Sequence, residues 1–290
     1  HNRPRNPWRQ MRNMKSGRWY PTVTAMSDGK MLITSGSVGP LAPLNGGNVN
    51  FLFEADRKHE FFDPKTMKLV DPPAIERELL TDRDFATYPG VFLLPKGPGR
   101  PNEEGTVIIV DRDRAHLYRY DSHVPRLRRS GSATYLNTTG AERTFPSYGA
   151  PVLLSVGHGI RTARILVVGG GSEVSKRLKS TRMSSDTAEM FEFNPRRSLR
   201  RQGGWSRTFR LAKRRVMPDA VLLPDGTVFV CGGAQTGYGN ENAGVVNEAE
   251  LFDPDMGQAG AFRPMDIAKT AEGRRYHSTA LLLPDGTVLS

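Results

Sequence analysis

Two tyrosines and a histidine have side chains able to bind a metal ion or transfer a proton. Tyr276 and His277 are adjacent and precede an apolar run, and Tyr20 precedes a similar run near the other end of the chain. Phenol oxygens and an imidazole nitrogen are borderline-to-hard donors, and a tetragonal set of such donors suits Cu(II). Packing for the tyrosines and an ordinary hydrogen bond for the histidine are the alternative explanations, which the spacing alone leaves open.

Repeated strand pairs are the elements that must position these residues. From Ser278 to Leu283 the chain is apolar and strand-forming, and Pro284-Asp285-Gly286 is a turn before a second strand. Related units cover residues 19–36, 88–110, 148–170 and 217–233. An aromatic strand ending in a turn follows the first four units, at residues 61–64, 118–121, 191–195 and 251–254. Such repeats indicate the blades of an all-β propeller, and unrelated hairpins in a β-sandwich are the alternative.

The register of these units predicts which residues meet. Nine residues separate the first strand position from the turn glycine in four units, at the pairs Tyr20–Gly29, Tyr88–Gly97, Met217–Gly226 and His277–Gly286. The innermost strands of a propeller line its central axis, so equivalent positions form a ring at one mouth of the channel. We therefore expect Tyr20 to lie near Tyr276 and His277.

Composition supports a turn-rich β protein. The 290 residues include 30 glycines and 21 prolines, and no apolar run approaches the ~18 residues of a membrane helix. The single cysteine, Cys231, excludes an internal disulfide and reads as a buried, inert thiol. Asn137-Thr138-Thr139 is an N-glycosylation sequon, which is weak evidence for secretion. Because position 1 is His1 rather than Met, we expect the chain to be processed or incomplete at its start.

The chain is strongly basic. Its net charge is +11, with clusters at residues 126–129, 196–201 and 213–215. A solvated loop surface explains such clusters, and a polyanionic partner (nucleic acid, an acidic glycan or an acidic protein surface) or a protein assembly is the alternative. No recognition helix, RNA-binding aromatic motif or zinc finger accompanies the charge.

Six short segments resemble, in order, the landmarks of the glyoxal oxidase branch of the copper-radical oxidases, the family that includes galactose oxidase. They are Arg18-Trp19-Tyr20-Pro21-Thr22, Glu60-Phe61-Phe62, residues 88–95, Arg143-Thr144-Phe145-Pro146, residues 215–219 and Arg275-Tyr276-His277-Ser278. The resemblance implies a seven-bladed kelch-type β-propeller followed by a β-sandwich domain, in an extracellular or secreted protein. Residues 1–290 would then hold about five blades, with the first blade or blades, the ring closure and the sandwich domain outside this chain.

The resemblance also implies an activity and a site. The family oxidises small aldehydes or primary alcohols with O2 and releases hydrogen peroxide, using one copper ion and a tyrosyl radical. Tyr20 matches the equatorial tyrosine that becomes the radical, Tyr276 matches the axial tyrosine that accepts the substrate proton, and His277 matches the first histidine ligand. Copper and the radical each hold one oxidising equivalent, so together they remove two electrons, while a basic phenolate takes the hydroxyl proton.

Some family features have no counterpart here. The cysteine that cross-links to the radical tyrosine would precede His1, and the second histidine ligand would follow Ser290. Val38 stands near the place where galactose oxidase has the tryptophan that stacks on the radical. Two hypotheses follow: an oxidase completed by flanking sequence, or a catalytically inactive basic propeller that serves as a scaffold or interaction subunit of an assembly.

Overall fold

The computed structural model consists of antiparallel β-sheets. It describes residues 8, 10–36, 58–70, 88–94, 105–111, 114–129, 148–154, 162–171, 184–194, 196–197, 205–236, 244–257, 261–265 and 273–290. Within these ranges the strands form four four-stranded sheets and one two-stranded sheet, and neighbouring strands in each sheet are consecutive in the chain. The expected all-β class is confirmed. Val38, the Asn137 sequon and most of the basic cluster at 196–201 lie outside the described residues.

Each sheet starts with a strand pair at one of the repeated units. The first holds β1 (Thr22–Ala25), β2 (Met31–Thr34), β3 (His59–Asp63) and β4 (Lys68–Val70). The second holds β5 (Gly90–Leu94), β6 (Thr106–Asp111), β7 (Arg114–Asp121) and β8 (Arg126–Arg129). The third holds β9 (Ala150–Leu153), β10 (Ala163–Val168), β11 (Ser185–Phe193) and β12 (Trp205–Arg215). The fourth holds β13 (Asp219–Leu222), β14 (Val228–Cys231), β15 (Glu250–Phe252) and β16 (Phe262–Pro264), and β17 (Leu281–Leu282) pairs with β18 (Val288–Leu289).

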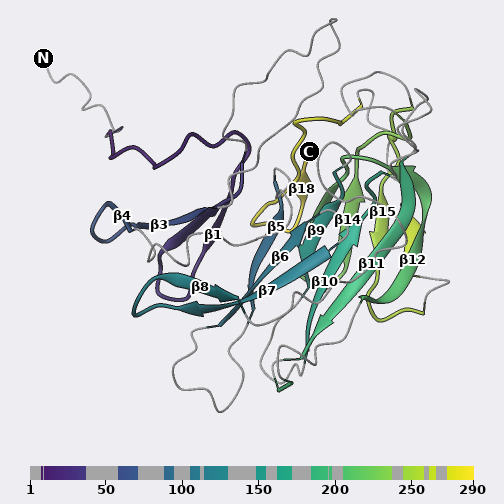
Figure 1. The fold of residues 1–290 in the computed structure, drawn as a ribbon. Coiled ribbons are helices and arrows are strands. Elements are labelled where there is room, and N and C mark those ends of the chain that lie inside the picture. Colours follow the sequence, from purple (N-terminus) through teal and green to yellow (C-terminus); the bar gives the residue numbers. More distant parts are fainter. Residues whose placement is uncertain are drawn as a thin grey trace, which may run out of the picture.

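The first strands of successive sheets lie next to one another. β1 contacts β5, β5 contacts β9, β9 contacts β13, and β13 contacts β17. Figure 1 shows the sheets following one another from the purple N-terminal sheet, through teal and green, to the yellow C-terminal strands. This propeller-like order gives every sheet one inner strand, which is the arrangement the register argument requires.

The repeated turns use the same local chemistry. The Asp225 carboxylate accepts hydrogen bonds from the Thr227 amide (3.0 Å) and hydroxyl (2.7 Å), and Asp285 accepts the same two bonds from Thr287 at the same lengths. The glycine that follows each aspartate has a positive φ, which only glycine adopts without strain. Identical turns place the inner strands in equivalent positions.

The last inner strand is shorter than expected. The sequence predicts a strand over residues 278–283, whereas β17 contains only Leu281–Leu282. Two features account for the difference. The Ser278 amide donates a hydrogen bond to the Arg275 carbonyl (2.7 Å), so residues 275–278 form a turn instead of a strand. In the pairing of β17 with β18, Leu281 lies opposite Leu289, so Thr279 would lie opposite position 291, outside this sequence.

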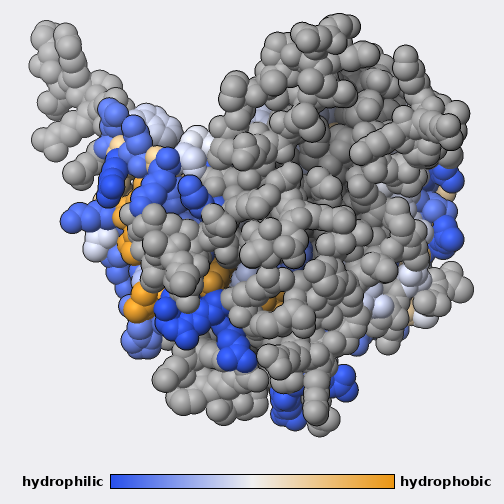
Figure 2. Space-filling model, viewed as in Figure 1, coloured by the Kyte–Doolittle hydropathy of each residue, from blue (hydrophilic) through white to orange (hydrophobic). Residues whose placement is uncertain are grey.

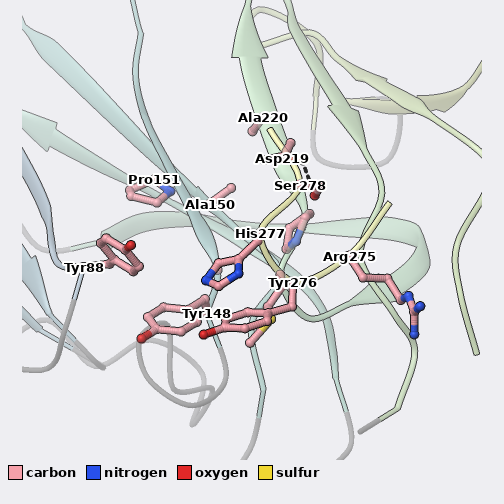
Figure 3. A pocket seen from close by; sticks show the side chains of 13 residues that line it. Tyr88, Tyr148, Ala150, Pro151, Asp219, Ala220, Arg275, Tyr276, His277 and Ser278 are labelled. Atoms are coloured by element: carbon pink, nitrogen blue, oxygen red, sulfur yellow. Dashed lines mark hydrogen bonds between the residues drawn. The ribbon is translucent and has the colours of Figure 1, made fainter. Parts of the chain in front are cut away.

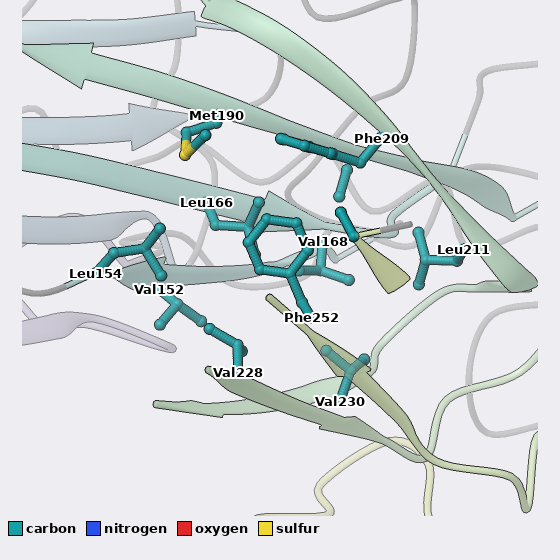
Figure 4. Packing of buried hydrophobic residues seen from close by; sticks show 12 residues of the cluster. Val152, Leu154, Leu166, Val168, Met190, Phe209, Leu211, Val228, Val230 and Phe252 are labelled. Carbon is teal, nitrogen blue, oxygen red and sulfur yellow. The ribbon is translucent and has the colours of Figure 1, made fainter. Parts of the chain in front are cut away.

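Apolar side chains fill the spaces between neighbouring sheets. In the cluster between the third and fourth sheets, Phe209 and Phe252 pack edge to face at 4.9 Å between ring centres. Figure 4 shows these rings among Leu166, Val228 and other aliphatic side chains. On the face seen in Figure 2, the described surface is mostly hydrophilic, with small hydrophobic spots. No helix in the described ranges has the length and apolarity needed to cross a membrane.

Two buried ion pairs join residues just ahead of the inner strands β1 and β13 to the third strands β3 and β15; Arg215 is the last residue of β12 in the preceding sheet. Arg18 pairs with Glu60 at 3.0 Å and Arg215 pairs with Glu250 at 2.8 Å, and these side chains are at most 3% exposed. Both arginines stand eleven residues before a turn glycine. Each also donates to backbone carbonyls: Arg18 to Ser35 and Lys58, Arg215 to Gly232 and Glu248. The pairs therefore fix the chain just ahead of Tyr20 and Met217, which belong to the position-nine residues, those that stand nine residues before their turn glycines.

Candidate metal and substrate site

The structure brings Tyr20, Tyr276 and His277 together. The Tyr20 hydroxyl lies in hydrogen-bond contact with the Tyr276 hydroxyl and 2.7 Å from Nε2 of His277. The rings of Tyr276 and His277 stack at 3.8 Å between centres. Two phenol oxygens and one imidazole nitrogen therefore meet at one point, although the first and the last of these residues lie 257 positions apart.

The backbone aims the position-nine side chains by adopting an unusual conformation. Tyr20, Tyr88, Met217 and His277 have φ values of 62°, 51°, 54° and 65°, in the left-handed region. For a residue other than glycine this conformation costs on the order of 1–3 kcal/mol, and such residues cluster at functional sites. The shared conformation gives all four residues the same turn at the start of their inner strands.

Aromatic rings cover both faces of Tyr20. Trp19 stacks on it at 3.6 Å between ring centres and 14° between planes, and Tyr88 stacks at 4.5 Å and 17°. The sequence does not predict this arrangement. The position-nine register indicated that Tyr88 is near Tyr20, but no sequence signal showed that the Trp19 ring would fold back onto its neighbour.

The phenols at this site hold their protons tightly. Burial, together with the hydrogen bond and charge of Tyr276, raises the pKa of Tyr20 to about 12. Burial and the nearby Tyr20 also raise the pKa of Tyr88. At neutral pH, Tyr20 is therefore a neutral phenol able to donate a hydrogen bond to His277.

A pocket of about 510 Å³ opens beside Tyr276 and His277. Figure 3 shows Tyr276 and His277 side by side in this pocket, and Ser278 joined to Asp219 by a hydrogen bond. The pocket also contains the phenols of Tyr88 and Tyr148, among other lining residues that come from four successive sheets. Its size is that of a small-molecule site.

The three converging donors fit a copper ion. Within the described part of the chain, no group of three or more His, Cys, Asp or Glu side chains is arranged to hold a metal. The phenols and the imidazole supply instead the oxygen and nitrogen donors that Cu(II) accepts. Cys231 lies elsewhere, on β14, where burial raises the pKa of its thiol, as expected for an inert side chain.

Three comparisons with known proteins agree with this description. The family described as glyoxal oxidase N-terminus matches residues 3–290. Aldehyde oxidase GLOX of Vitis pseudoreticulata is 28% identical over 97% of this chain and 47% of its own length. Galactose oxidase of Gibberella zeae is 34% identical over 76 residues, which are 26% of this chain and 10% of that protein.

The fold also has a counterpart among solved structures. A fungal alcohol oxidase of the AA5 family, solved in complex with copper, superposes with a TM-score of 0.58 at 22% identity, over 96% of this chain and 49% of that one. The chain thus spans about half the length of the Vitis aldehyde oxidase and of the fungal alcohol oxidase.

Proposed function

Because this chain belongs to the glyoxal oxidase N-terminus family, we propose that the protein is a copper-radical oxidase. It oxidises small aldehydes or primary alcohols with O2 and releases hydrogen peroxide. The observation that supports this proposal most strongly is the meeting of the Tyr20 hydroxyl with the Tyr276 hydroxyl and the His277 imidazole.

Each residue has a role that follows from its place. His277 would present Nε2 to the metal, and the oxygens of Tyr20 and Tyr276 would complete this chain's share of the ligands. Tyr276 borders the pocket, so its oxygen is placed to accept the proton of a substrate hydroxyl. A bound copper ion, together with a radical on Tyr20, would supply the two oxidising equivalents that the reaction needs. Trp19 and Tyr88 stack on the Tyr20 ring and hold it in place.

The rest of the assignment extends beyond the described residues. We include in the proposal a complete kelch-type ring of seven blades, of which residues 1–290 form about five. It also includes a following β-sandwich domain with a further histidine ligand, a cysteine partner for Tyr20 and a secretory location. Because the chain spans about half of the relatives' length, these features belong to the proposed full-length protein.

The alternative, a non-catalytic basic scaffold, gains less support. Arg126 in one basic cluster donates two hydrogen bonds to Asp121, and Arg128 lies 3.9 Å from the same carboxylate. Part of the positive charge is thus neutralised within the sheet. No comparable observation favours a polyanion.

Two substitutions in the full-length protein test the proposal. Tyr276→Phe should retain copper but lower peroxide release from a small aldehyde by at least about 100-fold, since general-base contributions are of that order. His277→Ala should weaken copper binding itself. Stoichiometric copper without peroxide release from the wild-type protein would refute the oxidase, and unchanged turnover in Tyr276→Phe would refute the role of this tyrosine.

A further inference from the structure

Neighbouring inner strands are linked by side chains at a shared register. Thr22 stands seven residues before Gly29, and its hydroxyl donates to the carbonyl of Pro89 in the next sheet at 2.8 Å. Asp219 stands seven residues before Gly226, and its Oδ2 accepts from the hydroxyl of Ser278 at 2.6 Å. Pro89 and Ser278 are themselves equivalent, each being eight residues before its turn glycine. The fourth and fifth sheets are therefore joined at the same point as the first and second.

The link between Asp219 and Ser278 uses a carboxyl group, whose ionised form is costly to bury. Burial raises the pKa of Asp219, although the Ser278 hydrogen bond partly opposes this shift. Threonine makes the equivalent link between the first two sheets without burying an ionisable group. The Asp219–Ser278 link also lies at the pocket, which both residues line together with Tyr276 and His277.

Ser278 connects Asp219 to the candidate ligands. It directly follows His277, and its amide closes the turn by donating to the Arg275 carbonyl at 2.7 Å. The backbone of His277 is held within this turn at a φ of 65°, a conformation that persists only when its surroundings enforce it. The Asp219 hydrogen bond anchors one end of the turn to the neighbouring sheet (Figure 3).

We propose that Asp219 is a positioning residue for the metal site. Through its hydrogen bond with Ser278 it fixes the turn that presents the Tyr276 phenol and the His277 imidazole to Tyr20. This inference rests on the proposed copper site. Partners that orient metal ligands typically affect metal affinity or activity by about 10–100-fold when they are removed.

Copper affinity, measured by competition with a chelator in the full-length protein, tests this role separately from turnover. Asp219→Ala and Ser278→Ala should each weaken copper binding by about 10-fold or more. Asp219→Asn keeps an oxygen that can accept from Ser278, so it should bind copper to within about threefold of wild type, a difference of under 1 kcal/mol. Should the alanine variant of Asp219 fail to fold, the comparison of Ser278→Ala with Asp219→Asn still gives an answer.

Thr24→Ala is the matched control. The Thr24 hydroxyl donates to the Val91 carbonyl of the next sheet at 3.3 Å, so its loss also removes a link between two sheets, but away from the turn at His277. It should lower the melting temperature and leave copper affinity unchanged. The inference is overturned if Asp219→Ala binds copper as wild type does, if Asp219→Asn is as weak as the alanine variant, or if Thr24→Ala weakens copper equally. If the wild-type protein binds no copper, the proposed function fails first, and the inference fails with it.

Discussion

Replacing Glu60 with alanine should destabilise the protein through a group that remains buried. Oε2 of Glu60 accepts hydrogen bonds from Nε (3.3 Å) and Nη2 (3.0 Å) of Arg18, and Oε1 accepts from the Lys15 amide (3.0 Å). The Arg18 side chain is fully buried. Glu60→Ala would therefore leave a guanidinium in the interior without its carboxylate, and we expect a loss of about 3–5 kcal/mol in the free energy of unfolding.

An exposed pair of the same kind provides the control. Arg210 and Asp186 lie 2.8 Å apart, but their side chains are 70% and 36% exposed. Asp186→Ala should cost less than about 1 kcal/mol, since water replaces the lost partner. The double variant Arg18→Met with Glu60→Leu should recover much of the loss, because it removes both charges.

Urea unfolding of the full-length variants, followed at more than one wavelength, measures these differences. A loss for Glu60→Ala as small as that for Asp186→Ala would refute the reasoning, since it would mean that Arg18 finds other compensation. Arg18 is two residues before Tyr20, so weaker copper binding should accompany the lost stability.

Three further predictions concern the site. Copper binding requires Tyr20 to lose a proton whose pKa is about 12, so copper affinity should rise by about tenfold per pH unit for each proton released. Calorimetry in buffers of different ionisation enthalpy would detect the proton release. A copper affinity that does not change with pH would contradict the prediction. Trp19→Ala should lower the pKa of Tyr20 toward its usual value, because burial is the main cause of the shift. Absorbance titration at alkaline pH measures this pKa, and subtracting the titration of the double variant Trp19→Ala with Tyr20→Phe isolates the Tyr20 phenol. Folding raises the pKa of Asp219, so the ionised carboxylate opposes folding at pH values above its unfolded pKa of about 3.9. Asp219→Asn should therefore raise the melting temperature by a few degrees at neutral pH. A gain in melting temperature that persists below about pH 3.9 would have another origin.

The sequence predicted the parts of the fold that depend on local chemistry. Turn residues such as Asp225 and Asp285 specify the same geometry wherever they recur, so counting from the turn glycines placed Tyr20, Tyr88 and His277 in equivalent positions. Their meeting required only that the inner strands share an axis. The roles of these residues in copper binding and catalysis stay predictions.

Details that depend on rotamers and on contacts between sheets could not be predicted. The Trp19 ring had several directions open to it, and the sequence did not select the one that covers Tyr20. Asp219 appeared to be part of an ordinary turn-strand unit, because its partner Ser278 comes from another unit, 59 residues away. The length of β17 was also overestimated, because the turn that the Ser278 amide closes with the Arg275 carbonyl takes up the start of the expected strand.

The most direct test of the copper site is the crystal structure of the full-length protein loaded with copper. We expect one ion, with the Tyr20 oxygen and the His277 Nε2 each at about 2 Å, the usual length for nitrogen and oxygen ligands of a divalent ion, and the Tyr276 oxygen as a further ligand. The ion should replace the hydrogen bonds that join Tyr20 to Tyr276 and His277. Copper bound at other residues, with the Tyr20, Tyr276 and His277 contacts intact, would contradict this expectation.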